Sequence, residues 1–137
     1  MVQMKKHRVL LKQRVFFGDC DPAGIVFYPN IFSWFDRAFH MLLDPLGGHA
    51  AVCKRLDALG MGVMDAKAQF RRPLRSGDEI QISLRVLEWG SKSVTLAYEV
   101  KKEDVFCVSG VEVRVQADRP GYDRGRHCSA ERGARSL

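Results

Sequence analysis

Two carboxylates lie in a short loop-forming segment directly before a predicted helix. Residues 18–24 contain two glycines, a proline and the pair Asp19 and Asp21, a composition typical of a tight turn. A helix beginning near Asn30 would present unpaired N–H groups and its positive dipole end to this loop. Such groups can polarise a carbonyl, and a neighbouring carboxylate can act as general base or nucleophile. Residue types and spacing therefore indicate a possible acyl-transfer site.

Purely structural roles for the same residues are the alternative. Aspartate and asparagine before a helix act most often as caps or turn formers. An Asp-x-Asp pair can bind a cation, but no acidic ladder follows at the spacing of a calcium loop. Cys20 lies between the two carboxylates, whose charge disfavours a thiolate, so we expect no nucleophilic role for it. No His/Cys cluster has zinc-ligand spacing, and no metal or other cofactor is expected.

Hydrophobic periodicity predicts the elements on either side of the loop. Residues 8–17 alternate as a strand with one apolar face, made of Val9, Leu11, Val15 and Phe17. Residues 30–44 have apolar side chains at helical spacing, with Asn30 as a suitable N-cap. A shorter helix is predicted over residues 49–59, before Gly60.

The chain after Gly62 has the pattern of four strands joined by short turns. The last strand, over residues 105–115, carries Val111, Val113 and Val115 on one face. Sequential hairpins form an antiparallel sheet, and one long apolar helix can cover a face of it. The expected class is therefore α+β.

The 137 residues suit one domain, which we assign to residues 1–117. Residues 118–137 lack apolar periodicity and form a basic Gly/Arg-rich tail that we expect to be partly disordered. The net charge of +6 is concentrated at the two ends, which argues against a nucleic-acid-binding face. No apolar run is long enough for a membrane helix or a secretory signal, so we expect a cytoplasmic protein.

Residues 17–36, FGDCDPAGIVFYPNIFSWFD, resemble the signature of the 4-hydroxybenzoyl-CoA thioesterase family. Weaker similarity extends over residues 8–117. The family has the hotdog fold, in which a five-stranded antiparallel sheet wraps around one long central helix. The resemblance implies an acyl-CoA thioesterase, with an aromatic, hydroxybenzoyl- or benzoyl-like acyl group. It also implies a homodimer or a dimer-of-dimers tetramer, with the acyl pocket at the subunit interface.

The same resemblance implies roles for individual residues. Asp21 matches the catalytic carboxylate, acting as nucleophile or general base. Tyr28 matches the position whose backbone N–H contacts the thioester oxygen, and Gly24 matches a loop glycine where a Cβ could crowd the acyl group. Asp36 matches the helix acid that faces the distal end of the aromatic group. Trp34 lies near it and is a candidate for the acyl pocket, although helix packing is the favoured role.

Contacts to coenzyme A are implied at the turn that contains Lys92 and Ser93, which matches a region that meets the phosphates. This turn lacks the adjacent arginines of some relatives, so Arg71, Arg72 or Arg75 could contribute instead.

Two alternatives to an aromatic acyl-CoA thioesterase stay open from the sequence. One is a thioesterase for short aliphatic acyl groups, and the other is a non-catalytic acyl-CoA-binding protein of the same fold. The aromatic residue usual after Asn30 is replaced by Ile31, which could alter the acyl pocket.

Overall fold

The computed structural model describes residues 7–118. The predicted order of a strand, a loop, a long helix and four further strands is confirmed. The strands are β1 (Arg8–Arg14), β2 (Gly60–Phe70), β3 (Glu79–Trp89), β4 (Ser93–Lys102) and β5 (Val105–Ala117). The helices are η1 (Phe17–Asp19), α1 (Tyr28–Leu43), η2 (Asp44–Leu46) and α2 (His49–Leu56), of which η1 and η2 are single 3₁₀ turns. The predicted tail lies outside the described residues except for Asp118.

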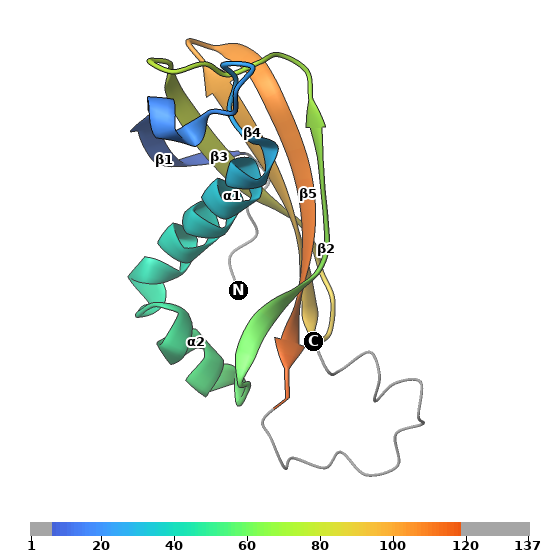
Figure 1. The fold of residues 1–137 in the computed structure, drawn as a ribbon. Helices are drawn as coiled ribbons and strands as arrows, with labels where there is room; N and C mark the ends of the chain where they lie inside the picture. The colour runs from blue at the N-terminus through green and yellow to red at the C-terminus, as the bar shows by residue number, and fades with distance from the viewer. Residues whose placement is uncertain (1–6, 119–137) are drawn as a thin grey trace.

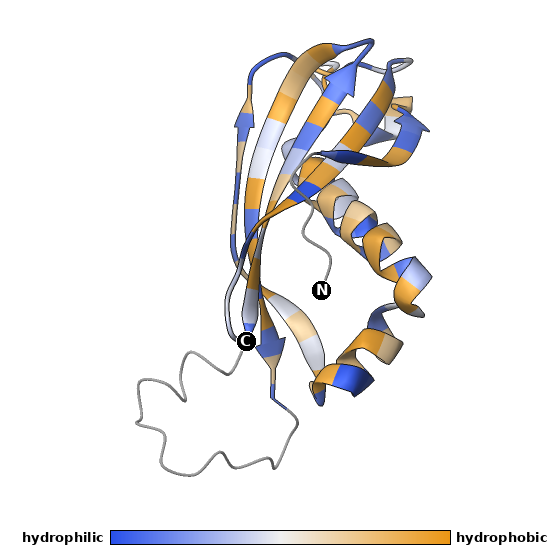
Figure 2. Ribbon diagram, turned by 180° about the vertical axis from the view of Figure 1, so that it is seen from behind, coloured by the Kyte–Doolittle hydropathy of each residue, from blue (hydrophilic) through white to orange (hydrophobic). Residues whose placement is uncertain are grey.

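All five strands form one antiparallel sheet in the order β1-β3-β4-β5-β2. The long helix α1 lies against one face of this sheet (Figure 1). Polar and apolar residues alternate along the strands, as the reverse view shows (Figure 2). The predicted α+β architecture is therefore confirmed. No helix within residues 7–118 is long and apolar enough to span a membrane.

The helix predicted over residues 49–59 ends earlier, at Leu56, where Asp57 takes a left-handed conformation. Two further predicted boundaries, both next to the loop, were also wrong. The helix α1 begins at Tyr28 rather than Asn30, because Pro29 fits the first turn of a helix, where its missing N–H costs no hydrogen bond. The strand β1 ends at Arg14, and Phe17 enters the turn η1, where it is 85% exposed instead of sharing the buried face with Val15.

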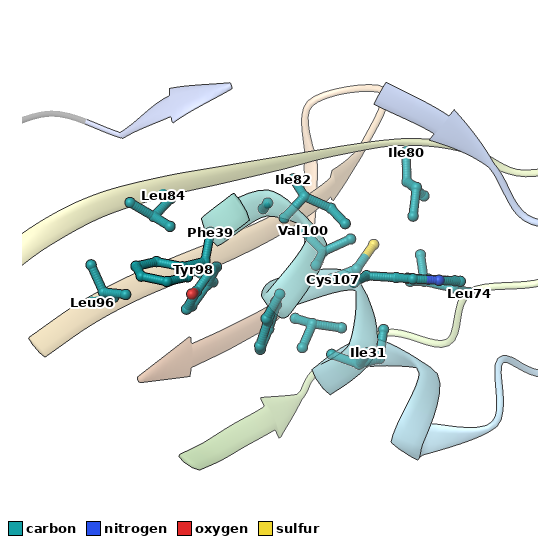
Figure 3. Close-up of a cluster of buried hydrophobic side chains, with 14 of the residues drawn as sticks. Ile31, Phe39, Leu74, Ile80, Ile82, Leu84, Leu96, Tyr98, Val100 and Cys107 are labelled. Carbon is teal, nitrogen blue, oxygen red and sulfur yellow. The ribbon is translucent and has the colours of Figure 1, made fainter. Parts of the chain in front are cut away.

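The core lies between α1 and the helix-facing side of the sheet (Figure 3). The ring of Phe35 stacks on that of Tyr98 with 4.4 Å between centroids. Gly110 on β5 lies beneath Phe35, so the helix approaches the sheet closely at this point. The most deeply buried helix residues are Ile31, Phe35, Ala38 and Phe39. This packing fixes the position of α1, and hence of its N-terminal end, over the sheet.

Candidate active site

The segment before α1 forms a very tight hairpin. A bridge pairs Cys20 with Val26, and the N–H of Asp21 donates to the carbonyl of Ile25 at 2.9 Å. The N–H of Gly24 donates back to the carbonyl of Asp21 at 2.8 Å and closes the turn. Gly24 has a φ of +83°, which glycine adopts without strain, and a Cβ there would meet nothing within 4 Å in this chain. Backbone conformation thus accounts for this glycine within one chain.

The two aspartates of the loop have different surroundings. Asp19 accepts a hydrogen bond from the N–H of Phe16 through its carboxylate, and its carbonyl accepts from the N–H of Phe27 and the side chain of Asn30. These bonds tie the loop to the helix start. The carboxylate of Asp21 accepts through Oδ1 from the N–H of Ala23 at 2.9 Å, its single hydrogen bond among the described residues. Its Oδ2 is therefore left for a ligand.

The helix start beside this hairpin offers a free donor. Phe27 is the N-cap residue, with extended backbone and no capping side chain, and Tyr28 is the first helical residue. The side chain of Asn30 is engaged by the loop carbonyl of Asp19. An N–H at the first helical position has no intrahelical acceptor, and no carbonyl of residues 7–118 accepts from Tyr28. The Tyr28 N–H is therefore available as a donor, and its contact with a thioester oxygen, which the family resemblance implies, stays a prediction.

Two turns further along α1, Asp36 lies over a buried polar cluster. Its Oδ1 accepts from Nη2 of Arg114 at 2.8 Å and lies 3.6 Å from Nε2 of His40. Nε of Arg114 donates to Glu112 at 2.6 Å, and the hydroxyl of Tyr98 donates to the same carboxylate oxygen at 2.8 Å. Arg114 and Glu112 are each about 3% exposed, while half of the Asp36 side chain is accessible.

This cluster shifts the pKa values of two of its members, Arg114 and Tyr98. Burial alone would lower the pKa of the Arg114 guanidinium, but the hydrogen bond and charge of Glu112, followed by the hydrogen bond to Asp36, outweigh it and raise that pKa. Burial, followed by the negative charge of Glu112, raises the pKa of the Tyr98 phenol, which stays protonated as a donor.

Three residues of this cluster were not predicted from the sequence: Tyr98, Glu112 and Arg114. The alternation of Val111, Val113 and Val115 correctly separates the two faces of β5, but the face that meets α1 is the other one. The signal available in the sequence was that two charged residues share the alternate positions with Gly110. A glycine there indicates a close backbone approach, and hence the buried face.

Two other residues considered from the sequence, Trp34 in α1 and Cys20 in the loop, make ordinary packing contacts. Trp34 is 4% exposed and packs in the core, so packing accounts for it, and contact with an acyl group stays a prediction. Cys20 makes a weak contact at 3.6 Å with the carbonyl of Phe16. Within residues 7–118 no group of three or more His, Cys, Asp or Glu side chains could hold a metal ion.

The residues predicted to contact coenzyme A fall into two groups, Lys92–Ser93 and the arginines of residues 71–75, which do not meet within one chain. Ser93 pairs with Val115 on β5, whereas Phe70, the residue before Arg71, pairs with Val108. Seven residues of extended strand separate Val108 from Val115 on β5, a distance of roughly 23 Å. The hairpin lies at the Arg71 end, since Ile25 bridges to Arg75. Figure 1 shows the 18–27 loop and the turn from β3 to β4 at opposite ends of the sheet.

Residues 23–107, which begin just after Asp21, match a family model described as "Thioesterase superfamily". The chain is also 31% identical over 121 residues to the 4-hydroxybenzoyl-CoA thioesterase of Pseudomonas sp. strain CBS-3, covering 82% of this chain and 85% of that one. The chain belongs to the thioesterase superfamily. It is a thioester hydrolase.

Solved structures support the same assignment. The thioesterase resembles a gentisyl-coenzyme A thioesterase with 37% identity and a TM-score of 0.71, over 80% of this chain and 88% of that one. The structure of the Pseudomonas enzyme aligns with a TM-score of 0.73 and 28% identity, over 88% and 93% of the two chains. A further relative, with 29% identity over 66% of each chain, is the 1,4-dihydroxy-2-naphthoyl-CoA hydrolase of Trichodesmium erythraeum strain IMS101. The fold of this thioesterase is accordingly the hotdog fold.

Proposed function

We propose that this thioesterase hydrolyses the coenzyme A thioester of an aromatic acid of the hydroxybenzoyl or benzoyl type. The names of its relatives support an aromatic acyl group, since they act on 4-hydroxybenzoyl, gentisyl and dihydroxynaphthoyl thioesters. In this proposal the enzyme works in the cytoplasm as a homodimer or a tetramer, with no cofactor besides the coenzyme A of its substrate.

The observation that carries the proposal is the hairpin that links Asp21 to the helix start. Asp21 pairs with Ile25, and Asp19 lies opposite Phe27, so Asp21 and the N-cap residue Phe27 are two strand positions apart, about 7 Å along the strand. A thioester fits between them, with its oxygen about 3 Å from the Tyr28 N–H and its carbon within about 3.5 Å of the carboxylate. The hydrogen bond from Ala23 holds the carboxylate in place from the other side.

Hydrolysis then follows one of two routes. As a nucleophile, the Asp21 carboxylate adds to the thioester carbon, the C–S bond breaks, and water hydrolyses the resulting anhydride. As a general base, Asp21 takes a proton from water while that water adds to the same carbon. In both routes the Tyr28 N–H stabilises the oxyanion, and the products are the free acid and the thiol of coenzyme A.

A second copy of the chain would complete the site. The strand β2 is an edge strand, and pairing of two antiparallel β2 strands about a two-fold axis would bring the Phe70 end of one chain beside the Gly60 end of its partner. Gly62 lies level with Ser93 through Val115 of β5. This arrangement would place Lys92 and Ser93 of one chain near the hairpin of the other, which is the interface site implied by the family resemblance.

The direct test is hydrolysis of 4-hydroxybenzoyl-CoA, benzoyl-CoA and butyryl-CoA, with the released thiol measured. We expect kcat/KM for the two aromatic thioesters to exceed that for butyryl-CoA at least tenfold. The opposite order would favour the short-chain alternative and overturn the aromatic assignment.

Replacement of Asp21 by asparagine tests the catalytic carboxylate. The amide oxygen of the asparagine can still accept the hydrogen bond from Ala23, so the hairpin should be retained while the base or nucleophile is lost. We expect kcat to fall by about 10²–10⁴-fold with an unchanged thermal midpoint. The matched control is Asp19→Asn. The wild-type Asp19 carboxylate accepts a hydrogen bond from the N–H of Phe16, and this variant should lose far less activity. Near wild-type turnover by Asp21→Asn would remove this residue from the mechanism.

A further inference from the structure

We propose that Arg114 is a positioning residue that holds Asp36 as a fixed hydrogen-bond acceptor and thereby selects acyl groups carrying a hydroxyl at the end distant from the thioester. The inference rests on the proposed function and narrows its substrate class. It assigns a role to a residue of β5 that lies 78 positions from Asp36 in the sequence.

The two oxygens of the Asp36 carboxylate differ in their hydrogen bonding. Its Oδ1 accepts from Arg114 at 2.8 Å and is the atom nearest to His40, at 3.6 Å. Oδ2 has no partner among residues 7–118, and the side chain is 51% exposed although the arginine beneath it is 3% exposed. A carboxylate held in this way presents acceptor positions only, so a hydroxyl is a suitable ligand for Oδ2.

Three neighbours contact the Arg114 guanidinium group: Glu112, Phe39 and Asp36. Its Nε donates to Glu112, which also accepts from the hydroxyl of Tyr98, and its guanidinium lies over the ring of Phe39, 4.0 Å from the centroid. Glu112 already balances its charge inside the core. Another donor of the same group, Nη2, reaches outward to Asp36. A planar guanidinium group fixed in this way orients the carboxylate of Asp36. The flexible ammonium group of a lysine would not do so.

The spacing along α1 fits one aromatic ring. Asp36 lies eight residues after Tyr28, which corresponds to about 12 Å along the helix. Hydrogen bonds of about 3 Å at each end leave roughly 6 Å for the acyl group, and the side chain of Asp36 leans toward the helix start. A ring with its hydroxyl opposite the thioester bridges this span. A ring without a hydroxyl would cover Oδ2 and leave it without a partner, which costs binding.

The test compares kcat/KM for 4-hydroxybenzoyl-CoA and benzoyl-CoA in the wild type and in Arg114→Gln. We expect the wild type to prefer the hydroxylated substrate, and the substitution to reduce this preference by about tenfold to a hundredfold. In an Asp36→Asn background the Arg114 substitution should not reduce the preference further, because both changes remove the same contact. Arg37→Gln is the matched control, since this exposed arginine of α1 bonds to Gln13; it should keep the wild-type preference.

A purely structural role for Arg114 predicts a different result. Lower stability would reduce activity toward both substrates by the same factor, leave the preference intact, and overturn the inference. Should Arg114→Gln fail to fold because Glu112 is left buried without its partner, the double variant Glu112→Gln/Arg114→Gln removes both charges and gives the same readout. Circular dichroism and thermal unfolding establish folding in each case.

The outcomes separate the inference from the proposed function. Hydrolysis of both aromatic thioesters with a preference that ignores Arg114 would overturn the inference alone. Hydrolysis of neither by the wild type would overturn both.

Discussion

At the scale of single residues, hydrogen bonds separate the roles of two aspartates that composition alone treats alike. Asp19 is bonded to the residues around it through both its side chain and its carbonyl, whereas Asp21 keeps one carboxylate oxygen open. Tyr28 contributes through its backbone, because a first-turn N–H is free by the geometry of a helix. The proposed chemistry thus depends on one side chain and one peptide group.

A proline at position 28 would remove this peptide donor. Phe27 has φ −65° and ψ 123°, a conformation favoured before proline, and proline is favoured at the first helical position. Tyr28→Pro should therefore fold, and we expect kcat to fall by about 10²–10³-fold. Tyr28→Phe retains the N–H and should lose much less activity. Equal losses in both variants, measured with the same thioester, would assign the effect to the phenolic hydroxyl and overturn the role of the peptide N–H.

At the scale of elements, the site depends on how closely α1 approaches β5. Gly110 lies beneath Phe35, and the backbone carbonyl of Lys67 lies 3.3 Å from the position a Cβ would occupy. This close approach lets Asp36 reach Arg114 and sets the depth of the helix over the sheet. The long helix is therefore the element that connects the hairpin with the buried polar cluster.

The substitution Gly110→Ala should disturb this packing. The new methyl group would overlap the ring of Phe35, which is fully buried and has little room to move. We expect the free energy of unfolding to fall by about 1–3 kcal/mol, and the thermal midpoint by roughly 5–15 °C. Gly18→Ala is the control, since a Cβ there meets nothing within 4 Å, and its midpoint should stay near that of the wild type. An unchanged midpoint for Gly110→Ala would contradict this account of the packing.

At the scale of the whole molecule, one chain leaves the proposed site incomplete. The predicted coenzyme A contacts lie at opposite ends of the sheet, and the edge strand β2 pairs on one side only among the described strands. Val63 and Met64 on this strand are 42% and 55% exposed. An open edge with exposed apolar side chains is a surface on which a second copy can add its own strand.

The substitution Met64→Lys tests this assembly. A charge on the edge should weaken strand pairing between copies. We expect light scattering to show twice the mass of one chain, or four times, for the wild type, and a shift toward one chain for the variant. The activity of the variant should fall at low protein concentration, together with its mass. Val105→Lys changes an exposed residue of the β4–β5 hairpin and should leave the mass unchanged. A monomeric wild type with full activity would overturn the interface site.

The class of the elements, their order and the loop motif could be predicted from the sequence, because periodicity and turn chemistry are local properties of neighbouring residues. The tertiary structure decided which face of β5 meets the helix, and it brought Asp36 to Arg114 across 78 positions. It also placed Arg71 and Lys92 far apart on the sheet. These features follow from strand register and from the packing of distant residues, which no local pattern specifies.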